Sequence, residues 1–161
     1  MRIQRCMILL ALCVSLAEGA NGQTNPPANS DDRAAIRQTA LDYIEGWYSG
    51  DGQRMERALH PELAKRMVST DSKTGKSSLN QTGAMTLVQN TSKGYGMHFP
   101  KDQQLKEITI LDVDEDAASV KIHAATWIDY LQLARWNGTW KIVNVLWEVK
   151  SGDGPQRKEQ K

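Results

Sequence analysis

Aromatic, aliphatic and polar residues alternate most regularly near the end of the chain. Two strand-like runs flank Asn137-Gly138, and four of the five tryptophans lie between Trp127 and Trp147. Asn-Gly is the preferred pair for a two-residue type I′ turn, because both central residues need positive φ. The pattern therefore predicts a long antiparallel hairpin over residues 129–148, with arms at the upper end of common strand lengths. Strands this long and this aromatic favour a curved sheet with other elements packed on its concave side.

Helical spacing dominates the first half of the chain. A stripe of apolar residues at intervals of three and four predicts a helix over residues 31–48 that ends at Gly50; it comprises Ile36, Ala40, Tyr43 and Trp47. Asp51 is suited to cap a second, shorter helix, which carries Met55 and Leu59 on one face and ends before Pro61. Thr82 is expected to cap a third helix, whose inward residues are Met85, Val88 and Leu87.

The remaining segments are mostly strand and turn. Residues 62–69 fit either a short strand or more helix, and residues 70–78 are expected to form a turn or a hairpin tip. Residues 93–104 are predicted to be loop, followed by strands over residues 105–113 and 117–123. Helices followed by an antiparallel meander indicate the α+β class, with about three N-terminal helices packed on one face of a strongly curved antiparallel sheet.

Both ends of the chain differ from this domain. Arg2 and Arg5 precede a short apolar run and small residues, which predicts a secretory signal peptide over residues 1–22, with cleavage after Gly19 or Gly22. An uncleaved anchor is the alternative, although the apolar run is shorter than the roughly 20 residues of a membrane span. Residues 23–30 are expected to be a flexible lead, residues 31–150 the folded domain, and residues 151–161 a disordered tail. The expected location is periplasmic or secreted, with no membrane contact after signal cleavage.

The charge balance and the cysteine content restrict the partners and the cross-links that the domain is expected to have. Without Arg2, Arg5 and Glu18, the 20 basic and 19 acidic side chains fall to 18 of each. With no basic excess and no long run of charge, nucleic acid is not an expected partner. Both cysteines lie in the predicted signal peptide, so the domain is expected to fold without a disulfide.

The apolar pattern of the last strand predicts that both faces of the sheet are covered there. In simple alternation, apolar residues occupy both of its faces, with Trp140, Ile142 and Leu146 on one and Val143, Val145 and Trp147 on the other. A strand with one solvated face would carry polar residues there. We therefore expect a homodimer partner to cover the second face.

Several blocks in order along the chain resemble one known family. They are Tyr43-Ile-Glu-Gly-Trp-Tyr-Ser-Gly-Asp51, Met55–Arg66, Ile110–Val113, Ala118–Lys121, Asp129–Leu131 and Trp140–Glu148. Over residues 34–149 the chain resembles the putative lumazine-binding family of the nuclear transport factor 2-like superfamily. The resemblance implies a cystatin-like cone with a pocket at its open end, often as a dimer. The superfamily includes ketosteroid isomerases, dehydratases, polyketide cyclases and many non-catalytic binding domains, so the resemblance carries over the fold better than the function.

Three polar residues are candidates for chemistry in such a pocket. Asp129 opens the last hairpin, and burial in an apolar cavity would suit it to act as a general base. The alternative is that it fixes the local turn by accepting bonds from backbone N–H groups. His123 fits a place on the rim of its strand, and His60 fits a structural place at a helix end. No ligand spacing among them indicates a metal site, and no motif indicates a cofactor.

Aromatic residues are the stronger clue to function. Tyr43 and Trp47 lie one helical turn apart, so they project together toward the sheet, where Met85, Tyr130 and Trp147 are expected to face them. Stacked aromatic rings with a flexible methionine suit a flat heteroaromatic ligand, and ordinary core packing is the alternative.

Three functions follow from these observations. The first is an exported domain that binds a small heteroaromatic or apolar ligand without transforming it. The second is an isomerase- or dehydratase-like enzyme with Asp129 as general base. The third is a homodimeric association module. The predicted pocket lining is Tyr43, Trp47, His60, Met85, His123, Asp129, Tyr130 and Trp147.

Overall fold

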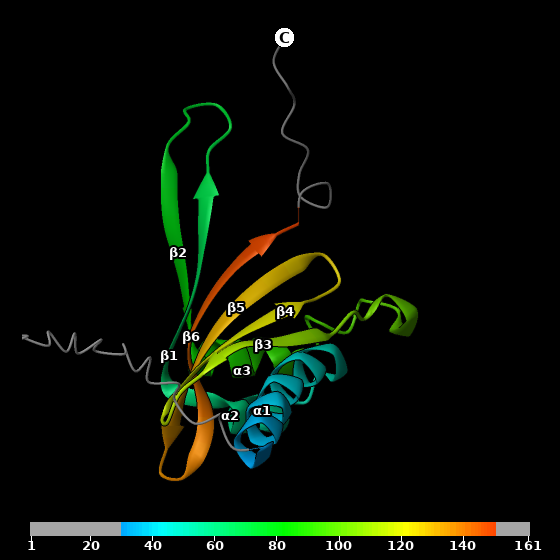
Figure 1. Cartoon of the computed structure of the whole chain (residues 1–161). Coiled ribbons are helices and arrows are strands. Elements are labelled where there is room, and N and C mark those ends of the chain that lie inside the picture. Colours follow the sequence, from blue (N-terminus) through cyan, green and yellow to red (C-terminus); the bar gives the residue numbers. More distant parts are fainter. Residues whose placement is uncertain (1–29, 151–161) are drawn as a thin grey trace, which may run out of the picture.

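The computed structural model describes residues 30–150, which form three α-helices, one short 3-10 helix and a six-stranded sheet (Figure 1). The predicted signal peptide, all of the predicted lead but Ser30, and the predicted tail lie outside the described residues. The elements are α1 (Ser30–Ser49), α2 (Gly52–Ala58), β1 (Leu59–Thr70), β2 (Ser77–Gly83), α3 (Ala84–Ser92), η1 (Lys101–Gln103), β3 (Glu107–Val113), β4 (Ala117–His123), β5 (Trp127–Trp136) and β6 (Thr139–Val149).

The strands are ordered β2-β1-β6-β5-β4-β3 in one twisted sheet. All neighbours are antiparallel except β1 and β6, which run parallel. Helices α1, α2 and α3 lie together on one side of the sheet, and the β1–β2 hairpin extends away from them (Figure 1). The predicted α+β class is confirmed.

The core lies between α1 and the inner face of the sheet. Ile36 and Ile44 of α1 are fully buried against strands that contribute equally buried aliphatic residues, namely Val120, Ile122, Leu131, Ile142 and Val145. Burial of each such side chain stabilises the fold by about 1.5–3 kcal/mol. This packing fixes which face of α1 meets the sheet, and therefore where Tyr43 and Trp47 point.

The β5–β6 hairpin confirms the predicted turn. Asn137 and Gly138 have φ of 49° and 77°, as the type I′ geometry requires. The first arm begins at Trp127, two residues earlier than predicted.

A β-bulge corrects the interpretation of β6. Leu133 pairs with Ile142 and Gln132 pairs with Asn144, so Val143 is an extra residue on β6. The bulge reverses the alternation, so that Ile142 before it and Val145 after it are both buried, whereas Leu146 is 49% exposed. The two apolar faces expected from the sequence are therefore largely one inner face. The homodimer stays a prediction, without this argument in its favour.

The segment after α2 also differs from the prediction. The second helix ends at Ala58, and Leu59 already has the extended conformation of β1 (φ −95°, ψ 146°). Residues 62–69, left open between strand and helix, belong to β1, and residues 71–76 form the tip of the hairpin. Strand β2 was not predicted because its sequence, Ser-Ser-Leu-Asn-Gln-Thr-Gly, has no apolar alternation.

The third helix begins one residue later than expected. Gly83, rather than Thr82, is its N-cap, and no side chain caps it. Ala84 and Leu87 face inward, whereas Met85 is 65% exposed, which corrects its predicted inward position.

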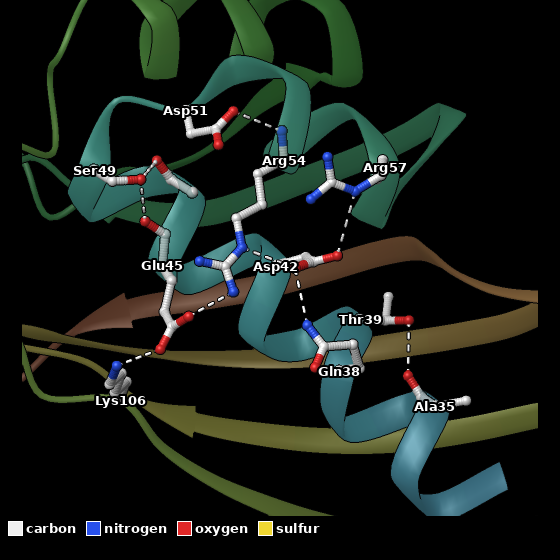
Figure 2. A network of polar contacts seen from close by, with 11 residues as sticks. Ala35, Gln38, Thr39, Asp42, Glu45, Ser49, Asp51, Arg54, Arg57 and Lys106 are labelled. Carbon is white, nitrogen blue, oxygen red and sulfur yellow. Dashed lines mark hydrogen bonds and ion pairs between the residues drawn. The ribbon is translucent and has the colours of Figure 1, made fainter. Parts of the chain in front are cut away.

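A network of charged side chains joins α1 to α2 and to the segment before β3 (Figure 2). Arg54 of α2 lies 2.8 Å from Asp42 and 2.5 Å from Glu45, and Glu45 also pairs with Lys106. Asp51 accepts a 2.9 Å bond from the backbone N–H of Arg54, so the predicted cap of α2 is confirmed. These contacts hold the exposed side of α1, while its opposite side faces the sheet.

Candidate functional site

A pocket of about 330 Å³ opens between the helices and the concave face of the sheet. Its walls come from α1, α3, the segment between α3 and β3, and strands β1, β2, β5 and β6. The lining residues are Tyr43, Ile44, Trp47, Lys65, Thr82, Leu87, Asn90, Phe99, Trp127 and Trp147. The volume lies at the lower end of the range typical of small-molecule sites.

Aromatic rings form most of the pocket wall. Tyr43 and Trp47 project from consecutive turns of α1, and Trp127 and Trp147 come from the two strands of the last hairpin. Phe99 closes one side, with its ring centroid 5.6 Å from that of Trp127. Rings at such spacing offer flat, polarisable surfaces on which a planar molecule can stack.

A buried polar cluster lies beneath these rings. Lys65 Nζ donates to Asp129 Oδ1 at 2.7 Å and to Tyr43 Oη at 2.5 Å. Asp129 Oδ2 accepts from Trp127 Nε1 at 2.7 Å and from Tyr43 Oη at 3.2 Å. The side chain of Asp129 is fully buried and that of Lys65 is 12% exposed. Each carboxylate oxygen therefore has partners, and the negative charge is balanced by one ammonium group.

This geometry corrects the structural interpretation of Asp129. Within residues 30–150, its side chain is bonded by Lys65 of β1, by Tyr43 of α1 and by Trp127 two residues earlier on its own strand, not by the backbone N–H groups of its own turn. It also weighs against Asp129 as general base, because the carboxylate has no exposed surface and its oxygens are engaged by Lys65, Tyr43 and Trp127.

Lys65 is the polar group of the cluster that reaches the pocket. Its Nζ lies 4.9 Å from the ring centroid of Trp147 and 5.3 Å from that of Tyr43, so the ammonium occupies the cation–π position of the aromatic box. An ammonium has three N–H donors, and two of them serve Asp129 and Tyr43. The third is available to an acceptor on a bound molecule.

Burial raises the pKa of the Tyr43 hydroxyl well above its usual value, and the nearby charge of Asp129 raises it further. Burial also raises the pKa of Tyr48, although less, because the N–H of Ala125 donates to its oxygen. Tyr43 is therefore a neutral donor to Asp129 across the physiological range of pH.

Ultraviolet titration of the tyrosines tests this protonation state. Tyr43 favours folding while it is neutral, so its contribution is complete below the unfolded pKa of about 10 and is lost as the pH rises above it. We expect tyrosinate absorbance from Tyr43 to appear only with alkaline unfolding. In Tyr43→Phe, the tyrosinate absorbance that appears only with unfolding should fall by one tyrosine, whereas Tyr95→Phe, at an exposed position, should leave this absorbance unchanged. Free titration of every tyrosine near pH 10 in the folded protein would contradict the buried position of Tyr43.

The segment between α3 and β3 forms one pocket wall by close backbone contact. Gly96 packs on Trp47 so tightly that a Cβ there would lie 2.2 Å from the Trp47 carbonyl oxygen. Tyr48 Oη donates to the Leu105 carbonyl at 2.9 Å, which anchors the end of the segment. Phe99 is held in the pocket wall between these two points.

The structure brings together some of the residues predicted to line a pocket. Tyr43, Trp47 and Trp147 line it, and Asp129 lies directly behind Lys65 and Tyr43.

The other four predicted residues lie outside this pocket. His60 packs edge-on against Trp136, and exposed Met85 borders a separate surface hollow that Trp136 also lines. His123 lies 3.8 Å from Glu107 on the neighbouring strand. Tyr130, one position after inward-facing Asp129, points to the outer face of the sheet.

Sequence reasoning missed Lys65, Thr82, Asn90, Phe99 and Trp127. The sequence signal for Lys65 was its position two residues after buried Leu63, because residues two apart in a strand lie on the same face of the sheet. This signal could be used only if residues 62–69 were known to form a strand.

Within residues 30–150, no group of three or more His, Cys, Asp or Glu side chains is arranged to hold a metal ion. None of the helices in these residues combines the length and apolar character needed to cross a membrane.

Comparisons with solved structures place the fold. A nuclear transport factor 2-like protein of unknown function from Methylobacillus flagellatus is 20% identical, with a TM-score of 0.58, covering 78% of this chain and 97% of that one. A similar protein from Silicibacter pomeroyi is 16% identical, with a TM-score of 0.56 and coverage of 75% and 98%. A nuclear transport factor 2-like protein with a cystatin-like fold from Novosphingobium aromaticivorans is 15% identical, with a TM-score of 0.56 and coverage of 76% and 84%.

Sequence comparison gives the family. Among curated proteins, none matches the chain significantly. The family model described as putative lumazine-binding matches residues 31–148, nearly the whole described domain. The chain therefore belongs to the putative lumazine-binding family and has the nuclear transport factor 2-like fold.

Proposed function

We propose that the domain binds a small, flat, heteroaromatic or largely apolar molecule between the rings of the pocket, without transforming it. The observation that carries this proposal is the position of Lys65, whose ammonium is fixed by Tyr43 and Asp129 inside an aromatic box. Rings supply stacking surface, and the remaining N–H of Lys65 supplies a directed donor for a ligand oxygen or nitrogen. The family description supports a ligand of this class.

Binding without catalysis is favoured by the state of the polar groups. The carboxylate that an isomerase-like reaction would need is buried and paired with Lys65. The ammonium of Lys65 is itself engaged by this ion pair and by the hydroxyl of Tyr43. We also propose export to the periplasm or beyond, on the basis of the signal-like pattern in residues 1–22.

A titration with lumazine, read by tryptophan fluorescence, tests the binding proposal. Three tryptophans line the pocket, so a stacked ligand should quench them in a saturable, one-to-one manner. Trp147→Leu removes one stacking face and is expected to weaken binding about tenfold, roughly 1.4 kcal/mol. Trp136→Leu is the matched control, because Trp136 is 52% exposed and borders a different hollow. Equal loss in both variants, or no saturable binding in the wild type, would contradict the proposal.

The donor role of Lys65 needs a variant that leaves no unpaired buried charge. The double variant Lys65→Met/Asp129→Asn removes both charges and keeps an acceptor for Trp127 and Tyr43. We expect it to fold and to bind lumazine at least about tenfold more weakly, because one charge-assisted hydrogen bond is lost.

Association is a second candidate function, favoured by one feature of the outer sheet face. Val68 and Leu79 are cross-strand partners on β1 and β2 and are 57% and 60% exposed, with Leu146 of the adjacent β6 49% exposed. A second copy of the chain would bury these side chains. A native mass of twice the monomer is the expected observation, and a monomer at micromolar concentration would remove this candidate.

A further inference from the structure

Two polar side chains in the pocket have no hydrogen-bond partner in the part of the chain that the structure describes. Thr82 of β2 and Asn90 of α3 line the aromatic pocket, and within residues 30–150 neither side chain makes a hydrogen bond. Every fully buried side-chain nitrogen or oxygen in this part of the chain has a partner. The unpaired groups of Thr82 and Asn90 are therefore accessible, and the pocket is the hollow that both residues line.

These groups lie on two sides of the pocket. Thr82 is the direct cross-strand partner of Lys65, so the hydroxyl and the ammonium form one polar patch on the sheet. Asn90 lies on the helix that begins directly after β2 and contributes an amide. A primary amide presents an acceptor oxygen beside a donor N–H₂, and it pairs best with a ligand edge that offers a donor beside an acceptor.

The charges in the pocket also indicate which net charge the ligand carries. Aromatic boxes attract organic cations, but Lys65 already occupies the cation–π position over Trp147. A cationic ligand would meet this ammonium at close range. An anionic ligand would lose its hydration on entering the pocket and would gain little in return, because the charge of Lys65 is already balanced by Asp129 at 2.7 Å. An uncharged molecule avoids both costs.

We propose that the ligand is an uncharged planar heterocycle with a lactam edge, an N–H adjacent to a C=O, and that Asn90 determines specificity by pairing with this edge. The inference rests on the proposed function, because it assigns a ligand class to the same pocket. It adds a recognition residue and a chemical feature that stacking alone does not require. A site built to bond a ligand N–H rejects an analogue that lacks it, since its own polar group is then left unpaired.

Two matched probes separate hydrogen bonding from stacking. Lumazine carries lactam edges, and 1,3-dimethyllumazine keeps the flat ring and both carbonyls but has lost the lactam N–H groups. We expect the wild-type protein to bind lumazine at least about tenfold more tightly than the dimethyl compound, as one lost hydrogen bond in a partly buried site predicts. In Asn90→Leu this ratio should fall to about one, while Thr82→Val should leave most of it.

The outcomes distinguish this inference from the binding proposal. Equal affinity of the wild-type protein for both probes, with dependence on Trp147, would overturn the lactam assignment and leave the pocket as a stacking site. A preference for lumazine that persists in Asn90→Leu would reflect steric exclusion of the methyl groups and would overturn the role of Asn90. Failure of both probes to bind the wild-type protein would overturn the binding proposal together with this inference. Thermal unfolding of each variant verifies that it is folded.

Discussion

Lys65→Met is expected to destabilise the domain by about 3–5 kcal/mol, because it leaves the Asp129 carboxylate buried without its counter-charge. Asp129 has no exposed surface, and Lys65 is its only cationic contact among the ion pairs of residues 30–150. Trp127 and Tyr43 still donate to it, but neutral donors do not replace an ammonium at 2.7 Å. Urea unfolding followed by circular dichroism gives the free energy directly.

A double-mutant cycle separates the ion pair from ordinary packing loss. Lys65→Met/Asp129→Asn should be more stable than Lys65→Met alone, since the second change removes the unpaired charge. Lys121→Met is the matched control, because Lys121 makes a similar contact with an aromatic ring, 5.5 Å from Tyr130, on the outer face. It should change stability by no more than about 0.5 kcal/mol. Additive effects of Lys65→Met and Asp129→Asn would contradict the coupling.

Gly96→Ala is expected to be the most damaging single-methyl change near the pocket. The added Cβ would lie 2.2 Å from the Trp47 carbonyl oxygen and 2.6 Å from a ring carbon of Trp47, so backbone or ring must move. Overpacking of this kind costs about 1–3 kcal/mol. Because the segment carries Phe99 and contacts Trp47, two pocket walls should shift and lumazine affinity should fall with stability.

Gly83→Ala is the control for the Gly96 substitution. A Cβ at Gly83 would have its nearest neighbour, the Leu63 carbonyl oxygen, at 3.9 Å, and φ there is −87°. Its effect on stability should therefore be a few tenths of a kcal/mol. Equal stability of Gly96→Ala and Gly83→Ala would show that the segment next to Trp47 is free to move aside.

Local signals in the sequence were sufficient for the hairpin and for α1. Asn137-Gly138 specifies its turn from two residues, and the stripe from Ile36 to Tyr43 specifies the buried helix face. The bulge at Val143 has no local signal, since it becomes visible only when β6 is aligned with β5. The interpretation of β6 failed for this reason.

The site depends on contacts between distant parts of the chain. Asp129 was identified as a candidate, but its partners Lys65 and Tyr43 lie 64 and 86 residues away. Lys65 reaches the pocket because β1 is a strand, and the apolar pattern of residues 62–69 did not decide this. Met85 was placed inward from the apolar pattern of the third helix, whereas in the structure Ala84 and Leu87 face the core.

The central claim is that the aromatic pocket holds a small ligand, and native mass spectrometry of the protein purified from its source without refolding tests it most directly. We predict one small molecule per chain, whose mass identifies it as an uncharged heterocycle and whose occupancy falls in Trp147→Leu but not in Trp136→Leu. A chain recovered empty from its source, which also fails to take up lumazine, would contradict the account.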